Sequence, residues 1–285
     1  MSIGTRRFKQ VDVFTRLPFR GNPVAVVLDG SGLAAADMQR IAAWTNLSET
    51  TFVLPPASAD ADYGLRIFTP RAELPFAGHP TIGSAHAVIE AGVVKPKGGK
   101  LRQECGAGIL DLQVEGETIW LHAPGATDTV FSEPELLQKV LGSKVRGAPR
   151  IMNVGPRWLV ADLGDAGKVA ALAPDLPALA EMSQRLSIGG VTVYGASADG
   201  ESALHVRSFA PAHGIPEDPV CGSGNISVAA YLVKTGQAQG IGKRYVARQG
   251  MQLGRDGRVS MKIENGGIFL GGSAVTCVEG TLTLA

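Results

Sequence analysis

The chain carries one segment twice, and this internal repeat limits its possible folds more than any other feature. Residues 77–92 align without gaps to residues 221–236, a constant spacing of 144 positions. The copies share glycines and apolar residues at matched places: Gly78 with Gly222, Ile82 with Ile226, Ala85 with Ala229 and Gly92 with Gly236. A period this long indicates a duplicated domain and not a short-period array of repeats.

Weaker matches in the same order extend the repeat over both halves of the chain. Residues 66–70 resemble 207–211, and residues 21–27 resemble 155–161. The length of 285 residues suits two domains of ordinary size. The proline- and glycine-containing segment at 123–128 is the best boundary. We therefore expect domains at 1–124 and 125–285, with the last strand able to cross back to the first domain.

Each copy of the repeat predicts a helix that begins directly after a glycine-containing loop. In the second copy, the strand-like run 203–209 precedes the loop 217–225, and the helix-like run 226–233 follows it. The first N–H groups of a helix lack partners, so they bind carboxylates or phosphates and lower the pKa of a nearby thiol. A glycine-rich turn with a serine cap is the structural alternative. Two domains related by a pseudo-two-fold axis are expected to direct both helix starts at one central cleft.

Glu49 lies at a junction between two predicted elements. Residues 33–45 have the periodicity of an amphipathic helix, with Trp44 on the apolar side, and residues 50–54 read as a buried strand. Glu49 is either a solvated residue at the end of a helix or a carboxylate held in the interior. Burial would raise its pKa and suit it to move protons near neutral pH. The matching place in the second half carries no acid, so the duplication is chemically asymmetric.

His79 also has two interpretations, and the three cysteines match no known site pattern. His79 matches Ser223 in the repeat, so it is either a loop or capping residue or a hydrogen-bonding group at the cleft. Cys105, Cys221 and Cys277 are too few and too scattered for a disulfide framework or a paired-cysteine metal site.

Composition and missing motifs exclude several classes of function. The formal net charge is +1, and the lysines and arginines are scattered, so neither nucleic acid nor an anionic membrane is an expected partner. No apolar run reaches membrane-spanning length, and we expect a cytoplasmic protein with reduced thiols. No complete GxGxxG, Walker or HExxH motif is present. These observations predict no cofactor and no metal, and favour acid–base chemistry on a small acid.

Several motifs occur in an order that resembles the phenazine-biosynthesis PhzF-like proteins, across nearly the whole chain. The motifs are Gly21–Val26, Ser48–Phe52, Phe68–Pro70, Glu73–Thr81 and Glu217–Pro219 with Gly222-Ser223. That family has the diaminopimelate epimerase fold. The resemblance implies an α+β chain of two similar domains, each with a curled mixed β-sheet around a central helix. It also implies a site between the domains and a homodimer.

The namesake activity of that family is cofactor-independent isomerisation of trans-2,3-dihydro-3-hydroxyanthranilate. Carried over residue by residue, the resemblance makes Glu49 the acid/base. His79, Asp218 and Ser223 would hold the substrate, a small carboxylic acid. Backbone N–H groups of two glycines, Gly78 and Gly222, would bind its carboxylate.

Cys221 departs from the phenazine pattern, which usually has threonine there. Racemase relatives carry their second catalytic thiol at this position, but the place of their first thiol is Ala77 here. Cys221 is therefore either a catalytic group or a buried small residue. An amino-acid or hydroxy-acid epimerase or dehydratase using Cys221 with Glu49 is one alternative to the isomerase, and a non-catalytic small-acid binding protein is another.

Overall fold

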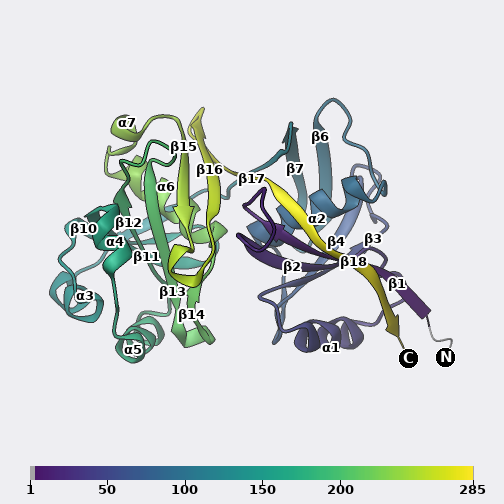
Figure 1. Cartoon of the computed structure of the whole chain (residues 1–285), viewed down its shortest axis with the longest axis horizontal. Helices are drawn as coiled ribbons and strands as arrows, with labels where there is room; N and C mark the ends of the chain where they lie inside the picture. The colour runs from purple at the N-terminus through teal and green to yellow at the C-terminus, as the bar shows by residue number, and fades with distance from the viewer. Residues whose placement is uncertain (1–3, 285) are drawn as a thin grey trace. The chain divides into compact units, whose positions relative to one another are not determined.

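The computed structural model of the chain describes residues 4–284 and divides them into two compact units. The first unit runs to His122 and also includes the chain from Gly271 on, and the second unit is Ala123–Leu270. The sequence-based division had placed residues 125–285 together and left the last strand open to return. In the structure the last strand pairs along its length with the first strand, and Figure 1 shows the two lying side by side.

The first unit is a mixed sheet with two helices. Its elements are β1 (Gly4–Val13), β2 (Asn22–Val27), α1 (Ala35–Thr45), β3 (Thr50–Leu54), β4 (Tyr63–Phe68), β5 (Glu73–Leu74), α2 (Gly78–Glu90), β6 (Lys100–Cys105), β7 (Gly108–Glu115), β8 (Thr118–His122) and β18 (Ala274–Leu284). The strands pair in the order β18–β1–β2–β3–β4–β6–β7–β8, with β2–β3 and β4–β6 parallel. The remaining pairs in this order are antiparallel.

The second unit repeats this plan with extra short helices. Its elements are β9 (Thr127–Val130), α3 (Pro134–Leu141), β10 (Arg146–Asn153), β11 (Arg157–Asp165), α4 (Ala166–Ala171), α5 (Leu176–Leu186), β12 (Gly190–Ala196), β13 (Leu204–Ala210), β14 (Ile215–Asp218), α6 (Gly222–Lys234), α7 (Ala238–Ile241), β15 (Arg244–Gln249), β16 (Gly257–Glu264) and the first four residues of β17 (Gly267–Gly272). The order β9–β10–β11–β12–β13–β15–β16 has parallel pairs at β11–β12 and β13–β15, as in the first unit.

Helices α2 and α6 are the central elements of their units. Helix α2 contacts β1, β2, β3, β8 and β18, and α6 contacts β10, β11, β12 and β16. Small residues allow the approach, since a Cβ at Gly83 would lie 2.5 Å from a methyl carbon of Val24. Most residues of both helices are buried. Each unit also has an outer helix, α1 in the first and α5 in the second. The apolar side of each outer helix packs into a core cluster of its own unit.

Helix α1 differs from its expected orientation at one residue. The periodicity placed Trp44 on the apolar side, but its side chain is 79% exposed, while Met38 and Ala42 form the buried contact. The buried stripe of α1 is therefore narrower than the hydrophobic pattern predicted.

Each unit carries the same arginine–glutamate pair beside the same aromatic ring. Two parallel hydrogen bonds join the partners in each pair: Arg66 with Glu73, and Arg207 with Glu217. Each guanidinium also lies over a phenylalanine ring two residues later, Phe68 or Phe209, at 5.1 and 4.9 Å. The structure thus confirms the duplication through a polar feature as well as through the sheet order.

Candidate active site

The turn between α1 and β3 brings Glu49 back toward the sheet. Asn46 ends α1 in the left-handed conformation, with a φ of 54°, which asparagine adopts more readily than most residues. The carbonyl oxygen of Glu49 then accepts a hydrogen bond from the backbone N–H of Ala25 on β2. The Glu49 side chain is only 15% exposed, and its Oε2 is inaccessible to solvent. Of the two interpretations of Glu49, the structure shows the interior carboxylate.

His79 lies within the first turn of α2, and its imidazole is buried. The helix begins at Gly78, so Pro80 is its third residue. Proline is tolerated in a first turn because its missing N–H has no intrahelical acceptor there. The residue before the helix is Ala77, without a side-chain cap. Nδ1 of His79 lies 3.3 Å from Oε2 of Glu49, an ion pair only when the imidazole is protonated.

The environment of Glu49 changes its acidity. Burial raises the pKa of Glu49 from 4.5 to about 7, against a hydrogen bond from the Ser48 side chain that lowers it. A carboxyl group with this pKa is present in both protonation states near neutral pH. It can therefore accept a proton and return it.

Cys221 precedes the first turn of α6 and acts as its N-cap. Its Sγ accepts a hydrogen bond from the backbone N–H of Gly224 at 3.2 Å, and the side chain is buried. Burial, followed by the negative charge of Asp218, raises the pKa of the Cys221 thiol well above its ordinary value. The sequence-based expectation that the helix start lowers this pKa is therefore wrong, because desolvation outweighs the backbone hydrogen bond.

A buried amide, Gln249, holds the loop that carries Asp218 and Cys221. Its Nε2 donates to the backbone carbonyl of Asp218 at 3.0 Å, and its Oε1 accepts from the backbone N–H of Cys221 at 3.1 Å. Oδ1 of Asp218 accepts from the N–H of Val220 at 3.0 Å, which closes a tight turn. The sequence analysis missed Gln249, and no motif marked it, since its role depends on β15 lying beside the loop.

Ser223 lies in the first turn of α6 and contacts a tryptophan from β11. The indole Nε1–H of Trp158 donates to Oγ of Ser223 at 3.0 Å. The Sγ of Cys221 lies 3.6 Å from the same oxygen. Trp158 is a second residue that the sequence analysis missed, although it stands in the segment 155–161 that matches 21–27.

Strand register shows which residue replaces Glu49 in the second unit. Two equivalent antiparallel pairs fix the alignment: Thr50 with Phe68, and Val191 with Phe209. Glu49 therefore matches Gly190, and no acid occupies the place, as the sequence predicted. A Cβ at Gly190 would lie 2.0 Å from the carbonyl oxygen of Phe209 and 2.9 Å from the Trp158 ring. The indole ring thus stands against Gly190, at the position equivalent to Glu49.

The predicted site residues form two groups, one in each unit. Glu49 and His79 meet in the first unit, at the helix that Gly78 begins. In the second unit, residues 218–223 bring Asp218, Cys221, Gly222 and Ser223 together around the start of α6. The neighbouring Glu217 has a different role, because both of its carboxylate oxygens bind the buried guanidinium of Arg207.

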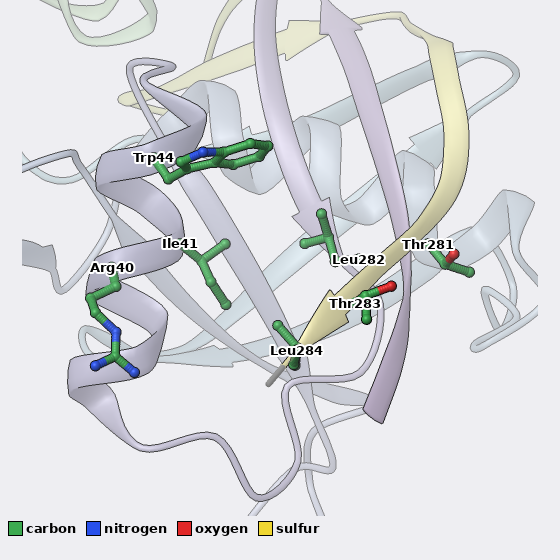
Figure 2. Close-up of a pocket in the computed structure, with 7 residues that line it drawn as sticks. All are labelled: Arg40, Ile41, Trp44, Thr281, Leu282, Thr283 and Leu284. Atoms are coloured by element: carbon green, nitrogen blue, oxygen red, sulfur yellow. The ribbon is translucent and has the colours of Figure 1, made fainter. Parts of the chain in front are cut away.

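The first unit also has an open groove that is separate from Glu49. Figure 2 shows this groove of about 350 Å³ between α1 and β18, lined by Arg40, Ile41 and Trp44 and by residues 281–284. Its lining includes no carboxylate, histidine or thiol that could move a proton near neutral pH.

The described part of the chain has neither a metal-binding cluster nor a membrane-spanning helix. Among residues 4–284, no three His, Cys, Asp or Glu side chains gather where they could hold a metal ion. No helix within the same range is long and apolar enough to cross a bilayer.

Comparison with known proteins places this architecture among solved structures. The chain covers 100% of a PhzF family protein from Bacillus anthracis over 99% of its own length, at 26% identity and a TM-score of 0.86. A hydroxyproline epimerase from Agrobacterium vitis matches over 98% of this chain and 93% of that protein, with 14% identity and a TM-score of 0.64. The second likeness is one of fold alone. The chain has the duplicated α+β fold of the diaminopimelate epimerase type, as the sequence predicted.

Sequence relatives span nearly the whole chain. The "Antisense-enhancing sequence 1" protein of Schizosaccharomyces pombe is 41% identical over 96% of this chain and 97% of its own length. A trans-2,3-dihydro-3-hydroxyanthranilate isomerase of Pseudomonas aeruginosa is 35% identical over 92% of this chain and 91% of its own length. The family model for phenazine biosynthesis-like proteins matches residues 11–280. The chain therefore belongs to the phenazine biosynthesis-like protein family.

Proposed function

We propose that this protein is an isomerase that moves a proton between two carbons of a small carboxylic acid, with Glu49 as the acid/base. The observation that carries the proposal is the buried Glu49 carboxyl beside His79, with a pKa raised to about 7. Relatives in the family that are named as isomerases support the reaction class. The substrate is trans-2,3-dihydro-3-hydroxyanthranilate or an acid of similar structure, by analogy with the named relatives.

The reaction needs one proton and no other reactant. The Glu49 carboxylate removes a proton from one substrate carbon, and the electron pair left behind is delocalised through the adjacent double bond. The protonated Glu49, whose carboxyl proton exchanges with solvent, then delivers a proton to another carbon, so that substrate and product have the same formula. Nδ1 of His79, 3.3 Å from Oε2, can donate to the carboxylate and stabilise its charged state. Burial excludes the water that would otherwise solvate the base.

In this proposal, the two helix starts and residues 218 and 223 bind the substrate. Backbone N–H groups at the helix starts of Gly78 and Gly222 bind a carboxylate, since first-turn N–H groups have no intrahelical acceptors. Ser223 adds a hydroxyl donor, and Asp218 accepts a hydrogen bond from the substrate amine or hydroxyl. Cys221 acts as the cap of α6.

The geometry of Cys221 gives no support to the thiol-based epimerase or dehydratase. A thiol whose pKa is raised is protonated near neutral pH and is a poor base, and Ala77 supplies no second thiol for the other face of a substrate carbon. The isomerase reading instead uses a residue, Glu49, whose pKa is matched to neutral pH.

The test is proton NMR of trans-2,3-dihydro-3-hydroxyanthranilate with the protein in D2O. We expect isomerisation with deuterium incorporated from solvent, and a loss on the order of a thousandfold in the Glu49→Gln variant. The matched control is Glu73→Gln, which removes an exposed carboxylate of the same unit and should leave the rate unchanged. A fully active Glu49→Gln variant contradicts the assignment of the base. Binding of the acid without turnover or exchange favours the non-catalytic alternative.

The homodimer that the family resemblance implies is part of the same proposal. Sedimentation velocity of the purified chain measures it directly, and a single species at the mass of one chain contradicts it.

A further inference from the structure

Trp158 matches Val24 in the repeat, so the second unit has an indole N–H where the first unit has an apolar side chain. Its ring stands against Gly190, the residue equivalent to Glu49, and its Nε1–H points at Ser223, the residue equivalent to His79. In the first unit, the same two positions hold a proton acceptor and an imidazole 3.3 Å apart. Both units therefore have a polar contact at the start of the central helix. The partner of the helix residue is the Glu49 carboxylate, an acceptor, in the first unit and the Trp158 N–H, a donor, in the second.

The direction of the Trp158 hydrogen bond determines what the Ser223 hydroxyl can do. An indole nitrogen is a donor only, so Oγ of Ser223 must be the acceptor in the 3.0 Å contact. The remaining hydroxyl proton of Ser223 is then directed away from Trp158. A hydroxyl that accepts one hydrogen bond also becomes a stronger donor for the next, because hydrogen-bond chains polarise their members.

Only a weak acceptor lies near that proton within the second unit. The Sγ of Cys221 is 3.6 Å from Oγ of Ser223, long for a strong hydrogen bond, and a neutral sulfur accepts weakly. A carboxylate oxygen is a much better acceptor and displaces this contact at little cost.

We propose that Trp158 is a positioning residue that fixes Ser223 as a hydrogen-bond donor to an anionic oxygen of the substrate. This inference rests on the proposed function, since it takes Ser223 as a substrate-binding residue. It also fixes the direction of the hydrogen bond, because Ser223 donates to the substrate and does not accept from it. The site therefore prefers an acid with a carboxylate or enolate oxygen at this point over the corresponding amide or ester.

Phenylalanine in place of Trp158 keeps one six-membered aromatic ring and removes the N–H donor together with part of the indole. The experiment is a double-mutant cycle of Trp158→Phe and Ser223→Ala, with calorimetric binding of 3-hydroxyanthranilate and the rate of isomerisation as readouts. We expect Trp158→Phe to weaken binding and raise KM by about fivefold, the effect of one hydrogen bond, and to change kcat less. In the Ser223→Ala background, the same substitution should change neither value by more than about twofold.

The matched control is Trp44→Phe, which removes the same N–H from a tryptophan that is 79% exposed. A further readout needs no ligand. The chain has 3 tryptophans, so the indole N–H resonances can be assigned from the single variants. Ser223→Ala should shift the Trp158 resonance and speed its hydrogen exchange, and leave the Trp44 resonance in place.

Each outcome decides one of the two proposals. Equal losses from Trp158→Phe in both backgrounds, or an unmoved Trp158 resonance, overturn the coupling. A wild-type protein that binds no 3-hydroxyanthranilate also overturns it, because Ser223 then donates to no such ligand. A wild-type protein that binds the acid and shows the coupling, but does not turn over the dihydro substrate, contradicts the proposed reaction alone.

Discussion

Oε2 of Glu49 lies 3.3 Å from Nδ1 of His79, in a part of the first unit where the carboxylate oxygen has no access to solvent. The two residues come from different elements, since Glu49 precedes β3 and His79 belongs to the first turn of α2. Their contact therefore depends on the packing of the central helix against the sheet. It joins a group that exchanges protons near neutral pH to a group that can carry a compensating charge.

The raised pKa of Glu49 predicts a pH-dependent stability. The folded-state pKa of about 7 lies above the ordinary value of 4.5, so the folded protein binds more protons than the unfolded chain between these values. The free energy of unfolding should therefore fall as pH rises from about 4.5 to about 7, by an amount on the order of 2–4 kcal/mol from this group. Urea unfolding between pH 4 and 8 measures it. The Glu49→Gln variant should lack this component, and parallel curves for the two proteins would contradict the prediction.

Cys221 should tolerate replacement by serine. A hydroxyl oxygen can accept the Gly224 N–H as the sulfur does, so Cys221→Ser should keep the isomerase rate within about threefold. Cys221→Ala removes the cap and should lower the free energy of unfolding by about 1 kcal/mol. Steady-state rates and urea unfolding check the two statements. A loss of more than a hundredfold in Cys221→Ser would restore the thiol-based mechanism.

The two arginine–glutamate pairs have the same hydrogen-bond geometry but differ in how far they are buried, so they show how burial affects the strength of an ion pair. The side chains of Arg207 and Glu217 are 6% and 9% exposed, against 30% and 41% for Arg66 and Glu73. Glu217→Gln leaves a buried guanidinium without its counter-charge, and we expect a loss of about 3–5 kcal/mol. Glu73→Gln should cost no more than about 1 kcal/mol, because solvent screens the exposed pair. Urea unfolding of both variants tests this; equal losses would show that burial does not set the strength of this contact.

Gly190 should not tolerate even one additional carbon. Its Cβ would meet the carbonyl oxygen of Phe209 and the Trp158 ring, so Gly190→Ala must displace the strand or the indole. We expect a loss of about 2–4 kcal/mol, together with a shifted Trp158 fluorescence spectrum. The adjacent Gly189 is the control, since its Cβ would approach no atom closer than 3.4 Å. A stable Gly190→Ala protein with unchanged fluorescence would mean that the strand yields without moving Trp158.

The sequence predicted the fold well because both halves of the duplication carry the same short sequence patterns. Small residues at matched spacing mark both central helices, since only small side chains let these helices approach the strands closely. The boundaries were less accurate. Helix α6 begins at Gly222, ahead of the predicted run of residues 226–233.

The candidate site was predicted only in part. The order of the motifs resembles that of a known family, and this resemblance pointed to Glu49 and His79. The roles of Gln249 and Trp158 had no signal in any local sequence pattern. Gln249 acts through three-dimensional contact with residues about 30 positions earlier. Trp158 acts through the register of β11 with β12, which sets its ring against Gly190.

The sequence by itself determined the duplicated architecture, the two central helices and the absence of an acid at the place in the second half that is equivalent to Glu49. These follow from residue size and spacing along one chain. The tertiary structure alone decided which charges are buried and what they face. It left Glu49 beside an imidazole, gave Glu217 a guanidinium partner and desolvated the Cys221 thiol. The physical reason is that ionisation energy depends on the surrounding solvent and charge, and these are set by residues far away in sequence.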